Sequence, residues 1–331
     1  MKRILLIIIV LLCSIRGHTC AAERLERLVI TGPSVSETYP LLRMSAVSKL
    51  REIADKIEFI PWHSTDQLRA MIAANQVDFV VLTTVSAANL YNKGAQIRIV
   101  DVFYPSSTWI ISADPDVYSL KDLKGSEVVL PFRPGDMPEI ILSAVISRQG
   151  IAPHRDIRFR YVGSPMDAVQ LMLLGRARHA FLSEPAASMA ILRSASIGKK
   201  VKAPLLRKSI DMQYEWGQAY PECPLIPLVA VTVVGNRAAS PEVVLRFRKA
   251  YKECVSWCLK HPEETGKQAA ALFTGLRKNP VASNIKETRY RMQTGTEARK
   301  DINFFLSVLK SENPACVGGK LPDRKFIWTA K

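Results

Sequence analysis

The loop "FRPGDMP" has a pattern that suits an anionic ligand. Its arginine, Arg133, can pair with a carboxylate, a sulfonate or a phosphate, and Gly135 permits close approach of the backbone. Asp136 stands where a helix is expected to begin, and the N–H groups that follow it, from Met137 on, favour a negatively charged group. Two interpretations of Asp136 stay open. It caps the helix together with Glu139, or it contacts a cationic or amine-bearing ligand.

Hydroxyl-bearing side chains stand at the starts of other expected helices. Free N–H groups at a helix start, with hydroxyls beside them, suit an anion or a carbonyl oxygen. Ordinary helix capping by Ser or Thr explains the same pattern without a ligand. The candidates are Ser34, Ser36, Thr38 and Tyr39 in "GPSVSETY", Thr83 and Thr84 in "TTVS", and Ser164 and Ser183 in two later loops.

Aromatic and titratable side chains complete the candidate binding residues. Trp62 suits stacking on a ring or an aliphatic ligand, and His63 suits a hydrogen bond, although a lone histidine after a strand also has structural roles. Glu184 suits a ligand N–H or a structural salt bridge. Tyr214 and Trp216, in "QYEWGQAY", form either an aromatic wall of a binding site or ordinary packing.

Two stretches of the chain, one beginning at Ser64 and the other at Ser164, share the same order of residue types. They read "STDQLRAMIAANQVDFVVLTTVSAA" and "SPMDAVQLMLLGRARHAFLSEPAAS". Each has a hydroxyl cap, an apolar run at helical spacing, a small polar turn, a short apolar run and a hydroxyl loop. The repetition predicts one α/β unit that is built twice.

Strand-like and helix-like segments alternate through the first two-thirds of the chain. The expected strands are "RLVIT", "KIEFIPW", "VDFVVL", "EVVLP", "IRFRYV" and "HAFLS", and helical patterns cover 39–54, 164–174, 241–261 and 297–309. Such alternation predicts mainly parallel sheets flanked by helices. The apolar segment "PLIPLVAVTVVG" is expected to be a strand that returns to the first unit.

The predicted fold is therefore α/β with two lobes, each a mainly parallel sheet flanked by helices, and with additional C-terminal helices. Residues 23–107 form the first part of lobe I and residues 108–222 form lobe II. Residues 223–331 return to lobe I and add the C-terminal helices and a tail. Ligands of open α/β sheets bind beyond the carboxyl ends of the strands. We therefore expect a cleft between the lobes, closing about crossings near 104–110 and 220–227.

Residues 1–22 have the pattern of a secretion signal. Lys2 and Arg3 precede an aliphatic run, and Ala21 and Ala22 are small residues suited to a cleavage site. The run is too short to span a bilayer, which needs roughly 20 apolar residues. We expect an exported, periplasmic protein, with an uncleaved anchor as the alternative.

The net charge of +16 is concentrated in one part of the chain. From Cys223 to Lys331 there are 19 basic and 9 acidic residues, whereas residues 23–110 are balanced, with 9 of each. Export and the lack of a nucleic-acid-binding motif exclude nucleic acid as the expected partner. The basic third is either a face toward anionic lipid or a protein partner, or a solvated surface.

Four cysteines follow the signal segment: Cys223, Cys254, Cys258 and Cys316. Export favours disulfides, and four cysteines allow three full pairings. We expect Cys316 to pair with Cys254 or Cys258. The five histidines are scattered without metal-binding spacing, and no nucleophile elbow or phosphate-cradling glycine loop occurs, so we expect no metal, cofactor or catalysis.

Several of these segments together carry a family resemblance. "STDQLRAMIAANQVDFVVLTT", "SLKDLKGSEVVLP" and "GIAPHRDIRFRYVGSPMDAVQLMLLGRARHAFLSEPAASMA", with the secretion signal, resemble the solute-binding proteins of ABC importers. The most similar group is the nitrate/sulfonate/taurine and thiamine-precursor binding family, which has the type II periplasmic-binding fold. The resemblance covers roughly residues 27–275 and implies a two-lobed receptor that delivers a small solute to a membrane permease.

The expected function is that of an exported, monomeric solute-binding protein. It traps a small organic anion or a heterocyclic solute between its lobes and delivers it to an ABC permease. One alternative is an enzyme of pyrimidine or thiamine-precursor metabolism on the same fold, although the cluster of cysteines found in such enzymes is missing here. A periplasmic ligand sensor is the other alternative.

Overall fold

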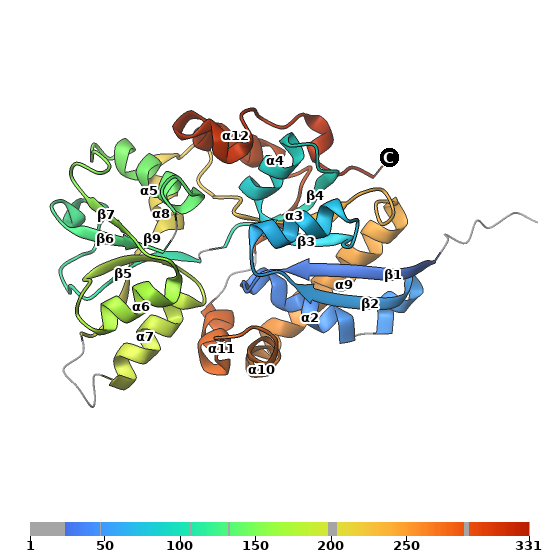
Figure 1. The fold of residues 1–331 in the computed structure, drawn as a ribbon, viewed down its shortest axis with the longest axis horizontal. Coiled ribbons are helices and arrows are strands. Elements are labelled where there is room, and N and C mark those ends of the chain that lie inside the picture. The colour runs from blue at the N-terminus through green and yellow to red at the C-terminus, as the bar shows by residue number, and fades with distance from the viewer. Residues whose placement is uncertain are drawn as a thin grey trace, which may run out of the picture.

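The computed structural model describes residues 24–46, 48–105, 107–131, 133–197, 204–287 and 291–330. The predicted secretion signal at residues 1–22 lies outside these ranges. Two lobes stand side by side, each built on one sheet (Figure 1). Within the described ranges, no helix combines the length and apolarity needed to cross a lipid bilayer.

The sheet of lobe I has six strands. Their spatial order is β11 (Met292–Thr294), β4 (Ile97–Phe103), β10 (Val229–Val234), β3 (Phe79–Thr83), β1 (Leu25–Gly32) and β2 (Ala54–Pro61). β2, β1 and β3 are parallel, whereas β10, β4 and β11 pair in antiparallel fashion. The apolar run of β3 is buried on both faces, as its sequence predicts, since Phe79 to Leu82 are at most 1% exposed.

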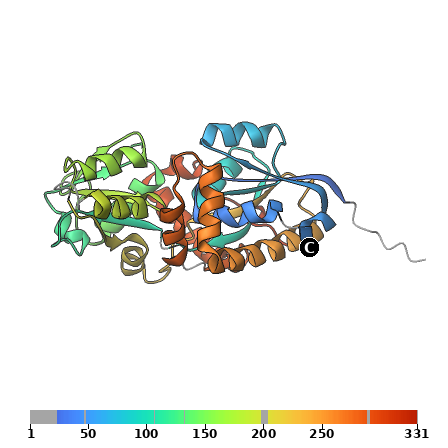
Figure 2. The same ribbon diagram turned by 90° about the horizontal axis from the view of Figure 1, so that it is seen from below.

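Helices cover both faces of this sheet. They are η1 (Ser36–Thr38), α2 (Tyr39–Ala46), η2 (Ser48–Glu52), α3 (Thr65–Ala73), α4 (Thr84–Asn92), α9 (Pro241–Lys260), α10 (Pro262–Leu272) and α11 (Lys278–Glu287). The long α9 packs against α2, and α10 and α11 pack against each other. Figures 1 and 2 both place α10 and α11 at the boundary with lobe II.

Lobe II repeats this plan with five strands. Their order is β7 (Arg158–Tyr161), β6 (Glu127–Leu130), β8 (His179–Ser183), β5 (Thr108–Ser112) and β9 (Arg207–Asp211). Its helices are η3 (Leu120–Leu123), α5 (Met137–Arg148), α6 (Pro165–Leu173), α7 (Ala186–Ile197) and α8 (Met212–Ala219). β7, β6 and β8 pair in parallel, whereas β5 is antiparallel to both of its neighbours, β8 and β9, so both sheets are mixed.

The hundred-residue repetition in the sequence corresponds to a repeated structure. α3 and α6 start one residue after Ser64 and Ser164, and each serine accepts a hydrogen bond from the backbone three residues on. β3 and β8 follow with the same burial pattern, four buried residues and then a half-buried hydroxyl residue. The predicted double α/β unit is therefore confirmed.

The chain passes between the two sheets in two places. Residues 104–107 join β4 to β5, and residues 220–228 join α8 to β10. After each crossing the chain forms a strand that is antiparallel to its neighbour. β5 pairs with β8 in lobe II, and β10 pairs with β3 in lobe I. The lobe boundaries at 107/108 and 222/223 stay predictions.

The C-terminal segment adds contacts between the lobes. α12 (Arg299–Glu312) packs against α5 of lobe II, and the following turn η4 (Pro314–Val317) packs against α4 of lobe I (Figure 1). α11 packs against α7 of lobe II. The last short helix is η5 (Arg324–Phe326).

Two predictions about local structure are wrong. The helical pattern at 39–54 is divided, because α2 ends at Ala46 and β2 already begins at Ala54. The predicted pairing of Cys316 is also wrong, since all four described cysteines are free. Cys316 belongs to the turn beside α4, whereas Cys254 and Cys258 lie on α9, which packs against α2.

Trp216 is a core residue and does not form the wall of a cleft. Its side chain is 0% exposed and packs on Tyr220 and Phe305, with ring centroids 4.4 and 5.5 Å away. Its Nε1 donates to the carbonyl oxygen of Cys223 at 2.9 Å. The residue therefore joins α8, the second crossing and α12.

Substitution Trp216→Ala should lower the free energy of unfolding by about 3–5 kcal/mol, the usual cost of removing a buried aromatic side chain. Tyr214→Ala is a matched control on the same helix, because Tyr214 is 62% exposed to solvent. Removing its side chain should lower the free energy of unfolding by less than about 0.5 kcal/mol. Urea unfolding measures both. Equal effects of the two substitutions would contradict the core assignment of Trp216.

Candidate functional site

The loop between β1 and α2 places four of the predicted residues at the boundary between the lobes. Ser36 donates from Oγ to Oδ1 of Asn284 on α11 at 2.5 Å, and Tyr39 is 1% exposed. Burial raises the pKa of Tyr39, and the negative charges of Glu37 and Glu184 raise it further, against a hydrogen bond with Ser34. Since Glu184 belongs to lobe II, the tyrosine hydroxyl faces an acidic group across the boundary.

A cluster of charged groups on lobe II faces this loop. Lys208 on β9 forms ion pairs with Glu184 at 2.7 Å and with Glu287 of α11 at 2.5 Å. The side chains of Lys208 and Glu184 are only 19% and 2% exposed. Burial opposes the charge on Lys208, but the two carboxylates outweigh it and raise the pKa of the ammonium group. The cation therefore stays charged and joins the two lobes.

Two polar atoms beside this cation have no hydrogen-bond partner within the described ranges. They are Nε1 of Trp109 and Oγ of Ser188, and both atoms are buried. Lys208 Nζ lies 5.3 Å from the centroid of the Trp109 ring. The backbone N–H of Ser188 donates to Glu184 Oε2 at 3.1 Å. Because buried polar groups are rarely left unpaired, the two atoms indicate a place for a polar group of a ligand.

A cavity of about 790 Å³ opens beside this cluster, between β5, β9, α8, the second crossing and α11; we call it the α8–α11 cavity. Its lining includes Trp109, Glu184 and Lys208 together with Tyr104 and Tyr214. Aromatic faces, a buried cation and the unpaired Nε1 of Trp109 together suit an organic molecule with a charged head.

A second cavity of about 350 Å³ also lies between the lobes. It is enclosed by α3 and α4 of lobe I, the loop before α5 of lobe II, and η4; we call it the α4–α5 cavity. Thr83, Arg133 and Gly135 line it. Thr83 caps α4, since its Oγ1 accepts from the N–H of Ser86 at 3.1 Å. The side chain of Arg133 is 87% exposed, so this guanidinium is a rim group that remains largely in solvent.

Asp136 precedes α5, but its carboxylate does not cap the helix. It accepts from the backbone N–H of Arg133 at 3.0 Å, and Glu139 accepts from the N–H of Gly135 at 2.7 Å. The two carboxylates thus hold the turn before α5 and leave the predicted capping pair unmade. Gly135 has φ 79°, in the left-handed region that glycine favours, and its carbonyl oxygen accepts from Asn313 at 3.3 Å.

The other predicted residues are divided between the two cavities and the protein framework. Glu184 and Tyr214 line the α8–α11 cavity; Thr83, Arg133, Gly135, Asp136 and Met137 line the α4–α5 cavity. Ser34 lies in the loop after β1, Ser36 and Thr38 lie in η1, Tyr39 begins α2, and Ser183 ends β8.

Several predicted residues have structural partners instead. Thr84 is 0% exposed and donates from Oγ1 to the carbonyl oxygen of Pro227, in the second crossing. Trp62 Nε1 donates to the carbonyl oxygen of Val81 at 3.3 Å, His63 is exposed, and Ser164 caps α6. The hydroxyl of Thr84 thus joins α4 to the crossing, and ligand binding by this residue stays a prediction.

Four residues of this region were not predicted from the sequence: Trp109, Ser188, Lys208 and Glu287. Trp109 and Lys208 lie on β5 and β9, which were not predicted as strands. Ser188 gave a weak signal, since it follows the repeated hydroxyl loop. Glu287 had no signal in the sequence, because α11 reaches lobe II only through tertiary packing.

Glu37 gives this region a dependence on pH. Burial raises the pKa of its carboxyl group to about 7, although a hydrogen bond from its own backbone lowers this pKa in part. Below the unfolded pKa both states carry the proton, and as the pH rises toward 7 the unfolded chain ionises first. Ionisation therefore favours unfolding in this window.

Relative to the Glu37→Gln variant, the wild type should lose about 3 kcal/mol of unfolding free energy between pH 4.5 and pH 7.5. Urea unfolding at a series of pH values measures the difference between the two proteins. Parallel curves over this range would show that Glu37 titrates normally in the folded protein.

Comparison with known proteins supports this description. Residues 50–230, more than half of the chain, match a family described as ABC transporter, phosphonate, periplasmic substrate-binding protein. None of the curated proteins compared with the chain matches it significantly.

Solved structures show the same fold at low sequence identity. The periplasmic aliphatic sulphonate binding protein SsuA from Escherichia coli is 18% identical with a TM-score of 0.73, covering 92% of this chain and 93% of that one. The alkanesulfonate-binding protein SsuA from Xanthomonas axonopodis pv. citri, bound to MOPS, is 16% identical with a TM-score of 0.64, covering 92% and 96%. The nitrate-binding protein NrtA from Synechocystis PCC 6803 is 12% identical with a TM-score of 0.58, covering 86% and 80%.

The predicted type II periplasmic-binding fold is confirmed by these structures. The family match also excludes the enzyme alternative, because the family consists of binding proteins. The chain belongs to the family of phosphonate-type periplasmic substrate-binding proteins of ABC transporters, and it is the solute-binding component of an ABC importer.

Proposed function

We propose that the protein binds a small organic anion, with a sulfonate or phosphonate head, between its two lobes and delivers it to an ABC permease. The observation that carries this proposal is the buried cation Lys208, with the unpaired Nε1 of Trp109 and Oγ of Ser188 beside it. An N–H donor and a hydroxyl next to an ammonium group suit the oxygens of a tetrahedral anion.

Glu287 has a distinct role in this proposal. Its carboxylate reaches from α11 to Lys208 and occupies the position that an anionic head would take. Three negative groups around one ammonium repel one another, so an incoming anion replaces Glu287, while the buried Glu184 keeps its contact. The exposure of 56% at Glu287 allows its carboxylate to turn into solvent.

The remaining features of the boundary fit an organic body behind the anionic head. Tyr104, Trp109 and Tyr214 supply aromatic surface along the α8–α11 cavity. Its volume of about 790 Å³ is in the range for small organic ligands and exceeds what a bare inorganic ion needs. Arg133, at the rim of the α4–α5 cavity, stays a predicted contact for the anion on its approach.

Two substitutions test the role of Lys208 with a panel of alkyl sulfonates and alkyl phosphonates. Lys208→Gln should weaken binding of the best panel member by about 10- to 150-fold, which corresponds to losing a hydrogen bond to a charged group of about 1.5–3 kcal/mol. Glu287→Gln should strengthen binding by up to about fivefold, because it removes a partly exposed competitor worth up to about 1 kcal/mol. Isothermal titration calorimetry measures both affinities.

Glu263→Gln is the matched control, since Glu263 also forms two ion pairs but lies on α10 with its side chain 53% exposed. Its affinity should equal that of the wild type. If no panel member binds the wild type, the anion class is wrong. If Glu287→Gln weakens binding, Glu287 contacts the ligand instead of competing with it.

Ligand binding should also close the two lobes about residues 104–107 and 220–228, since the ligand contacts both sides of the boundary at once. Small-angle X-ray scattering with and without the best panel member should show a smaller radius of gyration in the complex. Identical scattering curves at saturating ligand would rule out closure.

A further inference from the structure

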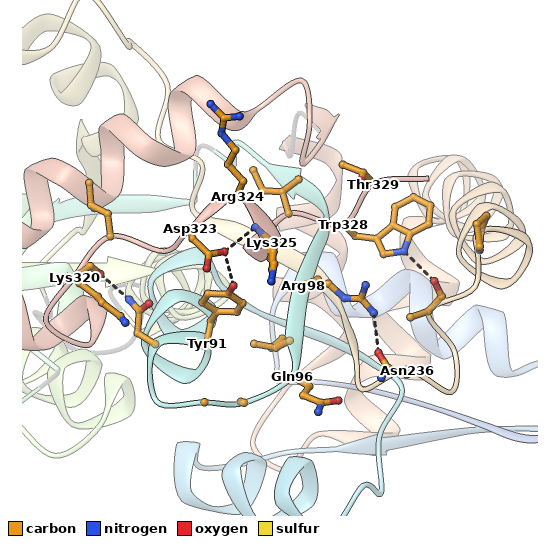
Figure 3. Close-up of a pocket in the computed structure, with 18 residues that line it drawn as sticks. Tyr91, Gln96, Arg98, Asn236, Lys320, Asp323, Arg324, Lys325, Trp328 and Thr329 are labelled. Atoms are coloured by element: carbon orange, nitrogen blue, oxygen red, sulfur yellow. Dashed lines mark hydrogen bonds between the residues drawn. The ribbon is translucent and has the colours of Figure 1, made fainter. Parts of the chain in front are cut away.

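A large cavity lies on lobe I, away from the boundary between the lobes. It is lined from three segments of the chain (Figure 3): Tyr91, Asn92 and 94–98 at the end of α4 and the start of β4; Asn236, Ala239 and Pro241 up to the start of α9; and Lys320, Leu321, 323–325 and 327–329 in the tail. Its volume is about 1070 Å³, and none of its lining residues belongs to lobe II. We call this cavity the tail groove.

The walls of the tail groove are fixed by specific hydrogen bonds. Tyr91 donates from its hydroxyl to Asp323 at 2.6 Å, and Asn92 donates from Nδ2 to the carbonyl oxygen of Lys320 at 2.6 Å. Trp328 donates from its backbone N–H to Ile99 at 2.9 Å and from Nε1 to Ala239 at 3.0 Å. The groove is therefore part of the folded lobe, even though one wall is the chain's tail.

The lining of the groove is strongly basic. It contains the four cations Arg98, Lys320, Arg324 and Lys325, and one acid, Asp323. Within the described ranges none of the four cations forms an ion pair with a carboxylate. Asp323 is already engaged, since it accepts from the Tyr91 hydroxyl and from the backbone N–H of Lys325 at 2.7 Å.

Two other arginines of lobe I are paired with buried carboxylates. Arg248 pairs with Asp101 at 2.8 Å, and Arg237 pairs with Asp78 at 2.5 Å. In the groove, by contrast, Arg98 has only neutral partners, the carbonyl oxygen of Gly235 at 3.2 Å and the side chain of Asn236 at 3.5 Å. The lining of the groove therefore carries an excess of positive charge.

The positions of the cations define the ligand chemistry. Arg98 and Lys325 both line the cavity. Figure 3 shows the guanidinium of Arg98 extending toward Asn236, whereas Arg324 points away from the other labelled residues. A guanidinium and an ammonium group that line one cavity favour phosphate oxygens, and a ligand with a single carboxylate would leave most of the positive charge of the lining unmatched. Leu321, 40% exposed, offers apolar surface at the opening.

We propose that the tail groove is a second binding site, which takes a phosphate-bearing molecule through Arg98 and Lys325. The phosphate comes either from a soluble polyphosphate compound or from the headgroup of an anionic lipid. This site is independent of the solute cleft, because the two share no lining residue.

Lys325→Glu tests the proposal, because the exposed side chain changes sign while the backbone N–H that holds Asp323 is kept. The matched control is Lys267→Glu, an equal charge change at an exposed position of α10 outside the groove. One probe is inorganic tripolyphosphate, measured by calorimetry. The other is vesicles of phosphatidylglycerol and phosphatidylcholine, measured by co-sedimentation against pure phosphatidylcholine vesicles.

The wild type should bind at least one probe, Lys325→Glu should bind it about tenfold more weakly or worse, and Lys267→Glu should stay within about twofold of the wild type.

Binding of tripolyphosphate identifies a soluble source of the phosphate, and binding of the anionic vesicles alone identifies a lipid source. Two results would overturn the proposal: no binding of either probe by the wild type, or an equal loss in both variants, which would reveal non-specific charge attraction. The affinity for the sulfonate and phosphonate panel should be unchanged in Lys325→Glu, so failure here leaves the cleft proposal intact.

Discussion

The ion pairs of Lys208 are the interaction on which the account of the cleft depends. A lysine that is only 19% exposed needs negative partners, and it takes Glu184 from its own lobe and Glu287 from α11 of the other lobe. Removing a charge from water is costly unless the charge is paired and hydrogen-bonded. The cluster therefore fixes how β9, the end of β8 and α11 meet.

The charge balance of this cluster explains how one site can both hold the lobes together and receive a ligand. The cluster has two acidic side chains for one ammonium group, and in the complex that we propose an anionic ligand takes the place of Glu287 and keeps this ratio. In that proposal the buried pair of Lys208 and Glu184 persists, and the half-exposed carboxylate at the end of α11 is the partner that moves. The N–H of Trp109 and the hydroxyl of Ser188 would then gain the partners that they lack.

The sequence predicted those parts of the fold that local patterns determine. The caps at Ser64 and Ser164, the buried strands after them and the long helix α9 depend on neighbouring residues, and all are present. The division of the helix at residues 39–54 could not be predicted, because each half has the same apolar spacing.

The cleft was harder to predict because its chemistry is assembled by distant pairing. Trp109 and Lys208 lie on β5 and β9, which come together only when the chain crosses between lobes and β5 enters between β8 and β9. A lysine in such a strand looks like a solvated edge residue in the sequence. The loop of Arg133, in contrast, has the sequence pattern of an anion site, but the fold leaves its guanidinium group largely in solvent.

Native mass spectrometry of freshly purified protein tests the central claim most directly. The wild type should retain a small molecule that, once released, ionises as an organic sulfonate or phosphonate, and Lys208→Gln purified in the same way should retain much less of it. A retained cation or neutral molecule, or equal retention of an anion by both proteins, would contradict the assignment of Lys208 as the group that holds the solute.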